Sequence, residues 1–160
     1  MTRIGVTGHM NITTDTVPLV YNEIRRVLAE NGDPANVVGI SCIARGADSV
    51  FARAVLDSGG RLEVVLPSRN YRERKVKPDH APKFDELIAR ADTVRVMDFD
   101  DAGRDAYEAA NEAVVGTCDR LVAVWDSQPS EKGGTGTVVD LAREKGVPVV
   151  IIWPDGAARS

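Results

Sequence analysis

The residues with the clearest capacity for chemistry form a short glycine-rich run, Gly133-Gly134-Thr135-Gly136-Thr137. Three glycines let a ligand approach the backbone closely, two threonines add hydroxyl groups, and a helical pattern begins immediately afterwards. The first N–H groups of a helix have no partner inside the helix, and they attract anions. We therefore predict that this loop binds a phosphate group. The alternative is a glycine-rich turn that lets the helix pack tightly against the rest of the protein.

A second candidate loop, Gly5-Val6-Thr7-Gly8-His9, follows the apolar start of the chain. Its N–H groups and the Thr7 hydroxyl could lie close to an anion, so we take Thr7, Gly8 and His9 as candidate ligand-binding residues. A tight turn between strand and loop explains the same residues equally well. The loop matches neither the Walker A pattern nor the full GxGxxG pattern, which removes the usual support for an ATPase or a dinucleotide-dependent dehydrogenase.

A third loop, within "SCIARGADSVFARAV", places Arg45, Gly46 and Asp48 where a strand gives way to a helix. The helix N-terminus and the arginine would then face the same anion. Asp48 or Ser49 could instead simply cap the helix. Capping gives no role to Arg45, so we favour ligand binding for that residue.

Residues 68–82 form a long polar connection with a local excess of basic residues. We consider Arg69, Tyr71 and Arg72 as a lid that closes over an anionic ligand, with Tyr71 stacking on a base. A solvated loop or a subunit contact is the alternative.

Three further polar residues complete the candidate set. Asp126 ends the apolar run "RLVAVWD", and Asn111 lies on the helical segment before that run. Asp140 lies one turn into the last helical segment. Carboxylates in these places could hold ribose hydroxyls or take part in acid–base chemistry. Asp140 could equally lie unused on the helix surface.

Six apolar runs alternate with helical segments and must position these loops: "RIGVTG", "VVGISC", "RLEVVLP", "TVRVMD", "RLVAVWD" and "VPVVIIWP". Their length and their content of Val and Ile predict buried strands. Strict alternation predicts an α/β fold in three layers, with a mostly parallel six-stranded sheet between helices. Gly32 and Gly146 are placed to end the first and last helices. Ligands bind such sheets beyond the carboxyl ends of the strands, where all the candidate loops lie.

Composition limits the function classes. The chain has 160 residues, of which 43% are hydrophobic, and a formal net charge of -4. We expect one domain over residues 1–160, and the acidic balance makes nucleic acid or an anionic membrane an unexpected partner. Cys42, Cys118, His9 and His80 do not form a zinc-binding pattern, so we expect neither metal nor cofactor. The sequence has no candidate membrane span or secretion signal, which predicts a cytoplasmic protein.

In these loops the chain resembles the SLOG superfamily, a Rossmann-like group that includes the LOG phosphoribohydrolases and DNA-processing protein A. The resemblance rests on "GVTGH", on "SCIARGADSVFARAVL" and on "CDRLVAVWD" followed by "GGTGTVVDLAREKGVPVVII". It implies the strand order 4-3-2-1-5-6, with the loops after the first and fifth strands facing each other. It also implies a homodimer or larger oligomer.

Two departures from the LOG pattern affect the predicted activity. LOG enzymes carry PGGxGTxxE with a catalytic glutamate, whereas this chain has Lys132 for the proline and the shorter Asp140 for the glutamate. Their arginine on the helix before the fifth strand has no counterpart near Ala110 and Asn111. We therefore predict a nucleotide-binding protein. The alternatives are a nucleotide N-ribosidase using Asp140 and Asn111, and a DNA-processing protein.

Overall fold

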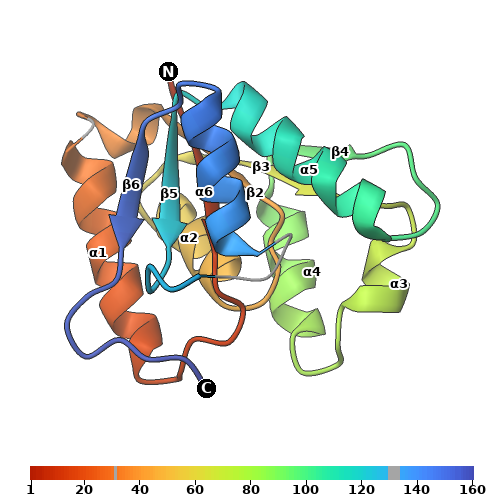
Figure 1. The fold of residues 1–160 in the computed structure, drawn as a ribbon, viewed down its shortest axis with the longest axis horizontal. Helices are drawn as coiled ribbons and strands as arrows, with labels where there is room; N and C mark the ends of the chain where they lie inside the picture. The colour runs from red at the N-terminus through yellow and green to blue at the C-terminus, as the bar shows by residue number, and fades with distance from the viewer. Residues whose placement is uncertain (31, 130–133) are drawn as a thin grey trace.

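The computed structural model describes residues 1–30, 32–129 and 134–160, which form an α/β fold around a six-stranded sheet (Figure 1). All neighbouring strands are parallel, and the order is β4-β3-β2-β1-β5-β6. The expected fold class and strand order are confirmed. The strands are β1 (Thr2–Gly8), β2 (Val37–Ser41), β3 (Arg61–Leu66), β4 (Thr93–Val96), β5 (Arg120–Val124) and β6 (Val149–Ile152).

The pairing of β1 with β5 creates a reversal in the strand order. β1 pairs with β2 on one side, and its residue Gly8 lies opposite Val124 of β5 on the other. From β1 the strands are added in sequence on one side as far as β4 at the edge. The chain then returns to the centre and forms β5 on the other side of β1. At such a point the loops that leave neighbouring strands diverge to opposite faces of the sheet, which opens a crevice.

One face of the sheet is covered by α1 (Thr16–Glu30) and α2 (Ala47–Asp57), and α4 (Ala81–Arg90) packs next to α2. Val20, Ile24 and Leu28 recur along one side of α1 and are fully buried. This spacing places them on the helix face that meets the sheet. The resulting core includes Ile4 and Val6 of β1, whose side chains alternate with those of residues on the opposite face.

The other face is covered by α5 (Arg104–Thr117) and α6 (Thr135–Glu144) (Figure 1). Their buried residues, including Ala110, Val114 and Val138, pack with Ile40 and Leu121 of the sheet. Gly5 of β1 points to this face, and a Cβ there would lie 2.8 Å from Val114 Cγ1. Gly5 therefore allows α5 to pack close to the central strand.

The ends of the first and last helices follow the glycine signals. Gly32 has a φ of 94° just after α1, and Gly146 has a φ of 73° just after α6. This left-handed backbone is readily accessible to glycine. Both predicted helix ends are confirmed.

Residues 68–82 differ from the predicted polar loop. They contain a short helix, α3 (Tyr71–Lys75), and Tyr71 is only 6% exposed within a cluster that includes Phe84 and Leu87. The sequence pattern does not reveal this helix because charged residues surround its one buried aromatic side chain.

After β6, the C-terminal segment returns across the loop that follows β1. Arg159 and Ile12 form an isolated antiparallel bridge, and Thr13 N–H donates to the Ala158 carbonyl at 3.0 Å. The Ser160 N–H donates to the Asn11 carbonyl at 2.7 Å. The segment therefore lies beside the carboxyl ends of β1 and β5. None of the helices in the described part of the chain has the length and apolarity needed to cross a membrane.

Candidate functional site

A pocket of about 780 Å³ opens at the carboxyl ends of β1 and β5, and we call it the switch-point pocket. It brings together residues from all the predicted loops and from the C-terminal segment. Its walls include Thr7, Gly8, His9, Asn11, Cys42, Asp48, Tyr71, Lys75, Tyr107, Asn111, Gly134, Thr135 and Arg159. The candidates from β1, α2, α5 and α6 therefore face one cavity although they are far apart in sequence.

Two of the predicted glycines, Gly8 in the wall of this pocket and Gly46 just before α2, have a packing role. A Cβ on Gly8 would lie 2.5 Å from Ala47 Cβ, and one on Gly46 would lie 2.6 Å from the Met10 carbonyl oxygen. Gly46 also has a φ of 78°. The loop after β1 and the start of α2 thus contact each other directly, which requires glycine at both positions. Close packing of the backbone therefore accounts for these two glycines without any ligand.

His9 is buried beneath the pocket, and its imidazole is held by the loop after β5. Its Nε2 accepts a hydrogen bond from the Asp126 N–H at 3.1 Å, and its ring meets the edge of Trp153 with centroids 5.6 Å apart. Burial, with a contribution from Arg159, lowers the pKa of His9. An Nε2 that accepts a hydrogen bond belongs to the neutral ring with its proton on Nδ1. His9 therefore supplies packing and an acceptor rather than a positive charge.

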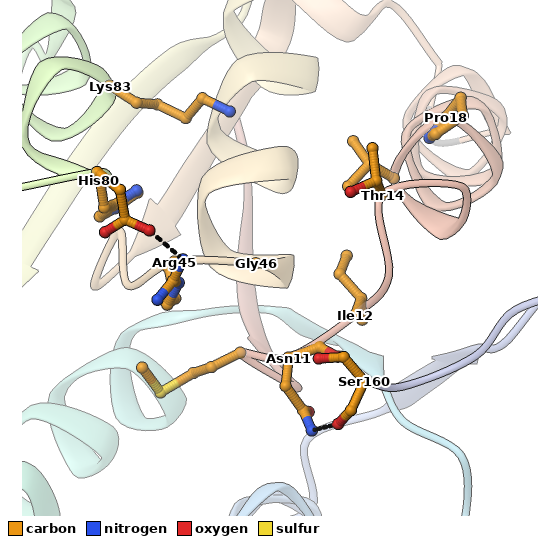
Figure 2. A pocket seen from close by; sticks show the side chains of 12 residues that line it. Asn11, Ile12, Thr14, Pro18, Arg45, Gly46, His80, Lys83 and Ser160 are labelled. Atoms are coloured by element: carbon orange, nitrogen blue, oxygen red, sulfur yellow. Dashed lines mark hydrogen bonds and ion pairs between the residues drawn. The ribbon is translucent and has the colours of Figure 1, made fainter. Parts of the chain in front are cut away.

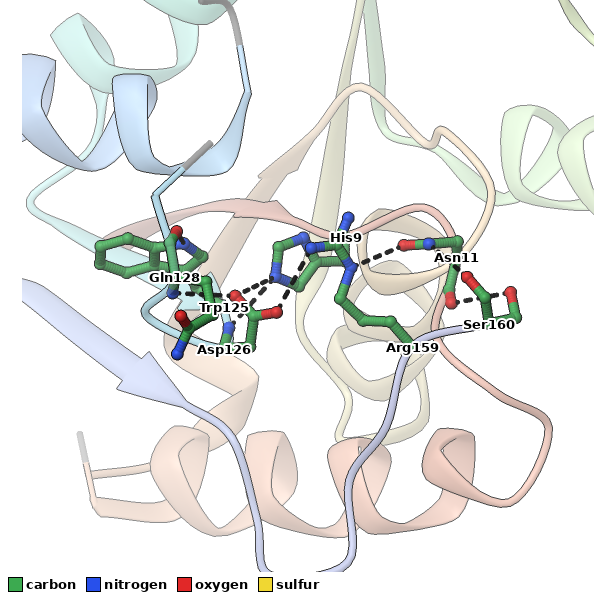
Figure 3. Close-up of polar contacts among 7 residues, drawn as sticks. All are labelled: His9, Asn11, Trp125, Asp126, Gln128, Arg159 and Ser160. Atoms are coloured by element: carbon green, nitrogen blue, oxygen red, sulfur yellow. Dashed lines mark hydrogen bonds and ion pairs between the residues drawn. The ribbon is translucent and has the colours of Figure 1, made fainter. Parts of the chain in front are cut away.

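Asp126 connects His9 to the C-terminal segment. Its Oδ1 accepts from the Gln128 N–H at 3.0 Å, and its Oδ2 lies 3.3 Å from Nη1 of Arg159 (Figure 3). Burial acts to raise the pKa of Asp126, but the Gln128 N–H and Arg159 outweigh it and hold that pKa below its ordinary value. The carboxylate stays ionised and fixes the position of the arginine.

The first residues of α6 form another wall of the pocket. Gly134 is the N-cap residue, with an extended backbone (φ -80°, ψ -175°), and Thr135 is 8% exposed. The Gly134 carbonyl accepts from the Thr137 and Val138 N–H groups at 3.1 and 3.3 Å, as a helix start requires. Gly133 lies outside the described residues. Thr137 is exposed. Gly134 and Thr135 are the described residues of this loop that line the pocket.

The opposite wall combines aromatic, thiol and carboxyl groups. Burial raises the pKa of Tyr71 and Cys42, and it raises the pKa of Asp48 to about 7 against an ordinary value of 3.8. A hydrogen bond from Ala44 N–H opposes the shift at Asp48 without cancelling it. Tyr107 is 38% exposed and meets Tyr71 edge-on, with centroids 6.4 Å apart. This wall offers an aromatic ring and a carboxyl group whose pKa burial raises to about 7.

The two residues predicted for catalysis lie in different surroundings. Asn111 is half-buried on α5 and lines the pocket. Asp140 is exposed on α6 and is not among the described residues that line it. The helix turns the side chain of Asp140 away from the sheet because Val138, Val139 and Ala142 occupy the buried face.

Arg45 and Gly46 line a second pocket of about 590 Å³ and not the switch-point pocket, as far as the described residues go. Figure 2 shows Lys83, His80 and Arg45 on one side of it and Thr14, Ile12 and Asn11 on the other. Arg45 Nη2 forms an ion pair with Asp79 at 2.7 Å. This differs from the expectation that Arg45 and Asp48 face one ligand. α2 begins between them, so their side chains leave the loop in different directions.

The expected lid also takes a different form. Arg69 forms ion pairs with Asp98 and Asp100, and Arg72 forms a two-pronged pair with Asp85 at 3.0 and 2.8 Å. Neither arginine is among the described residues that line the switch-point pocket. Tyr71 does line it, as a buried part of the wall.

Within the described part of the chain, no three His, Cys, Asp or Glu side chains come together as a metal site would require. Cys42 lines the pocket, but burial raises its thiol pKa, so it is held as the protonated thiol. These residues offer hydrogen bonds and aromatic contacts to an organic ligand.

Comparison with solved structures identifies the fold. DNA-processing protein A (DprA) from Streptococcus pneumoniae matches with a TM-score of 0.73 and 18% identity over 98% of this chain. The chain has the fold of that protein. It spans about half (52%) of the length of the S. pneumoniae chain. The likeness to DNA-processing protein A read from the sequence is thus confirmed for the fold.

Two further structures share the fold. DNA-processing protein A from Helicobacter pylori, which binds single-stranded DNA, has a TM-score of 0.69 and 17% identity, covering 99% of this chain and 68% of its own. The molybdenum cofactor carrier protein of Chlamydomonas reinhardtii has a TM-score of 0.59 and 21% identity, covering 94% and 75%. No family model and no curated protein matches the sequence. The expectation that nucleic acid is not a partner is not borne out, because a protein of this fold binds single-stranded DNA.

Proposed function

We propose that this protein binds a nucleotide or a related nucleoside phosphate in the switch-point pocket. The observation that carries the proposal is the place of the pocket between β1 and β5, with the N-terminus of α6 forming part of its wall. Parallel sheets bind ligands at such points, and a helix N-terminus there stabilises negative charge.

The phosphate group would lie against Gly134 and Thr135, with the Thr7 hydroxyl on the facing wall. Gly134 has no side chain that could cap α6, so a ligand can approach the N-terminus of this helix. Hydrogen bonds from backbone N–H groups to charged phosphate oxygens are short and strong. Gly133 and Gly136 belong to the same loop and are part of the proposal.

The base would lie on the aromatic side of the pocket. Tyr107 is the exposed aromatic residue of this wall, and Asn111 lies one turn further along α5. A base stacks on an aromatic ring with little dependence on its identity, whereas the Asn111 amide and the Asp48 carboxyl can form hydrogen bonds with its polar edge. These groups support a ligand that has both a phosphate and an aromatic part.

Binding without turnover has more support than N-ribosidase activity. Stabilising an oxocarbenium-like centre needs a carboxylate beside the sugar, and Asp140, the predicted one, is exposed outside the pocket. Two proteins of the same fold bind or carry a ligand, the single-stranded DNA-binding protein of H. pylori and the cofactor carrier of C. reinhardtii.

Isothermal titration calorimetry with AMP, GMP, CMP, UMP, their nucleosides and a short single-stranded oligonucleotide tests the proposal. At least one monophosphate should bind more tightly than its nucleoside. Gly134→Asp should abolish this preference, because the carboxylate would cap α6 and repel the phosphate.

Gly134→Asn is the matched control. Asparagine caps a helix as well as aspartate does but carries no charge, so both variants should fold with similar melting temperatures. Gly134→Asp should bind the monophosphate more weakly than Gly134→Asn. Failure of every monophosphate to bind below millimolar concentration, or equal binding by Gly134→Asp and the parent, would contradict the proposal.

A further inference from the structure

The C-terminal segment delivers an arginine to the switch-point pocket from outside the predicted loops. Arg159 lies after the last strand, and its backbone bridges to Ile12 in the loop after β1. Its side chain is 41% exposed and lines the same pocket as Thr7, Gly134 and Thr135. The segment therefore adds a positive charge to the pocket whose wall includes the N-terminus of α6.

The guanidinium of Arg159 is held in place from two sides, as Figure 3 shows. Its Nε donates to Asn11 Oδ1 at 3.0 Å, and its Nη1 donates to Asp126 Oδ2 at 3.3 Å. Nη2 has no hydrogen-bond partner among the described residues. A fixed arginine loses little side-chain entropy when it binds an anion, and its free N–H groups suit a phosphate or carboxylate oxygen.

Asp126 only partly offsets this charge. Its carboxylate is shared between Arg159 and the Gln128 N–H, and it meets Arg159 through one long bond instead of a two-pronged pair. Arg72, by comparison, is engaged by both oxygens of Asp85. Arg159 thus faces a single carboxylate oxygen and keeps Nη2 for a ligand, whereas the charge of Arg72 is matched by a two-pronged carboxylate.

The other described cations do not provide a fixed charge at this place. His9 is neutral, and Arg45 lines the second pocket in an ion pair with Asp79. Lys75 lines the switch-point pocket from the short helix α3, on the wall that carries Tyr71. Among the described residues, Arg159 is the cation that neighbouring side chains fix at the pocket.

We propose that Arg159 binds the anionic group of the ligand in the switch-point pocket, together with the N-terminus of α6. This inference rests on the proposed function. The sequence favoured Arg45 for the role that we assign to Arg159. Arg159 lies 114 positions later in the chain and outside the three glycine-containing loops.

Calorimetry on Arg159→Gln and Arg45→Gln, with the monophosphates and nucleosides used above, tests it. Arg159→Gln should weaken the tightest-binding monophosphate about tenfold or more, because hydrogen bonds from a charged donor are lost. It should change the affinity for the matching nucleoside less than about twofold. Arg45→Gln should leave both affinities within about twofold. Arg159→Lys, which keeps a charge without the planar fork, should fall between the parent and Arg159→Gln.

The outcomes separate the two proposals. If no nucleotide binds the parent protein, the proposed function fails and this inference fails with it. If a monophosphate binds and Arg159→Gln binds it equally well, only the role of Arg159 is overturned. Equal losses for the monophosphate and its nucleoside would also overturn it, since they would indicate that Arg159 merely holds the loop after β1 in place. Circular dichroism and thermal melting confirm that each variant is folded.

Discussion

The Nε2 atom of His9 accepts a hydrogen bond from the backbone N–H of Asp126, which lies 117 residues later in the chain. This bond joins the loop after β1 to the loop after β5 beneath the switch-point pocket. It also sets the ring in its neutral form, because the same nitrogen cannot accept this bond and carry a proton. The buried imidazole therefore adds a side-chain link to the backbone bond from the His9 N–H to the Val124 carbonyl at 3.1 Å.

Removing this acceptor should destabilise the protein. His9→Phe keeps an aromatic ring against Trp153 but leaves the Asp126 N–H without its partner, at an expected cost of about 1–3 kcal/mol. His9→Gln retains an acceptor and should cost less. Urea unfolding followed by circular dichroism gives both values. A His9→Phe variant as stable as the parent would show that the bond contributes nothing to stability.

The contact between the loop after β1 and the start of α2 should not tolerate a methyl group. Gly46→Ala combines a φ of 78° with a Cβ 2.6 Å from the Met10 carbonyl oxygen, so we expect a loss of about 2 kcal/mol or more. Gly116 is the matched control, since it is exposed on α5 and a Cβ there would meet no atom within 4 Å. Gly116→Ala should stabilise the protein by about 0.5–1 kcal/mol. Thermal melting distinguishes the two directions.

Asp48 should make stability depend on pH between about 4 and 7. The unfolded chain releases this proton near pH 3.8 and the folded protein near pH 7, so the folded state holds the extra proton in between. Stability due to Asp48 is therefore fully present below pH 3.8, falls as pH rises, and is constant above about 7. The Asp48→Asn variant has no carboxyl group at this position, so it does not lose this stability as the pH rises. Its amide oxygen can still accept a hydrogen bond from the Ala44 N–H.

The test compares the melting temperatures of the parent protein and of Asp48→Asn at a series of pH values. The melting temperature of Asp48→Asn should rise relative to the parent as the pH increases from about 4 to about 7, and the difference should then level off. Asp155→Asn, a change at an exposed carboxylate, is the control and should show no such trend. Parallel melting curves for the parent and Asp48→Asn across this range would contradict the burial of the Asp48 carboxyl.

Tyr107 should contribute to ligand affinity through its ring and not through its hydroxyl. Its 38% exposed side chain lines the pocket, so Tyr107→Ala should weaken nucleotide binding by about 1–3 kcal/mol, whereas Tyr107→Phe should bind nearly as well as the parent. Calorimetry at one pH and ionic strength measures both. A large loss in Tyr107→Phe would indicate a hydrogen bond in place of stacking.

The local pattern of the sequence was sufficient for the fold class. Runs such as "RLVAVWD" are apolar on both faces, which only a covered strand accommodates, and their alternation with helical segments requires parallel pairing. Gly32 and Gly146 ended their helices as expected, because a left-handed residue is a local backbone requirement. The strand order came from the resemblance of the sequence to the SLOG superfamily.

The helix α3 and the role of Tyr71 were not foreseen from the sequence. Its five residues include four charged ones, so no amphipathic period appears in the sequence. The buried position of Tyr71 arises from contacts with Phe84 and Tyr107, which lie on later helices. Such contacts exist only once those helices are packed.

The gathering of the candidate loops at the carboxyl edge of the sheet could be predicted from the order of strands and helices along the chain, because that order fixes the strand directions. The side chains that face the pocket could not be predicted in this way. Packing turned Arg45 toward Asp79 and Asp140 toward the exterior, and it brought Arg159 beside Asp126. Hydrophobic periodicity is a local property of the chain, whereas side-chain direction and the path of the last segment depend on contacts between distant residues.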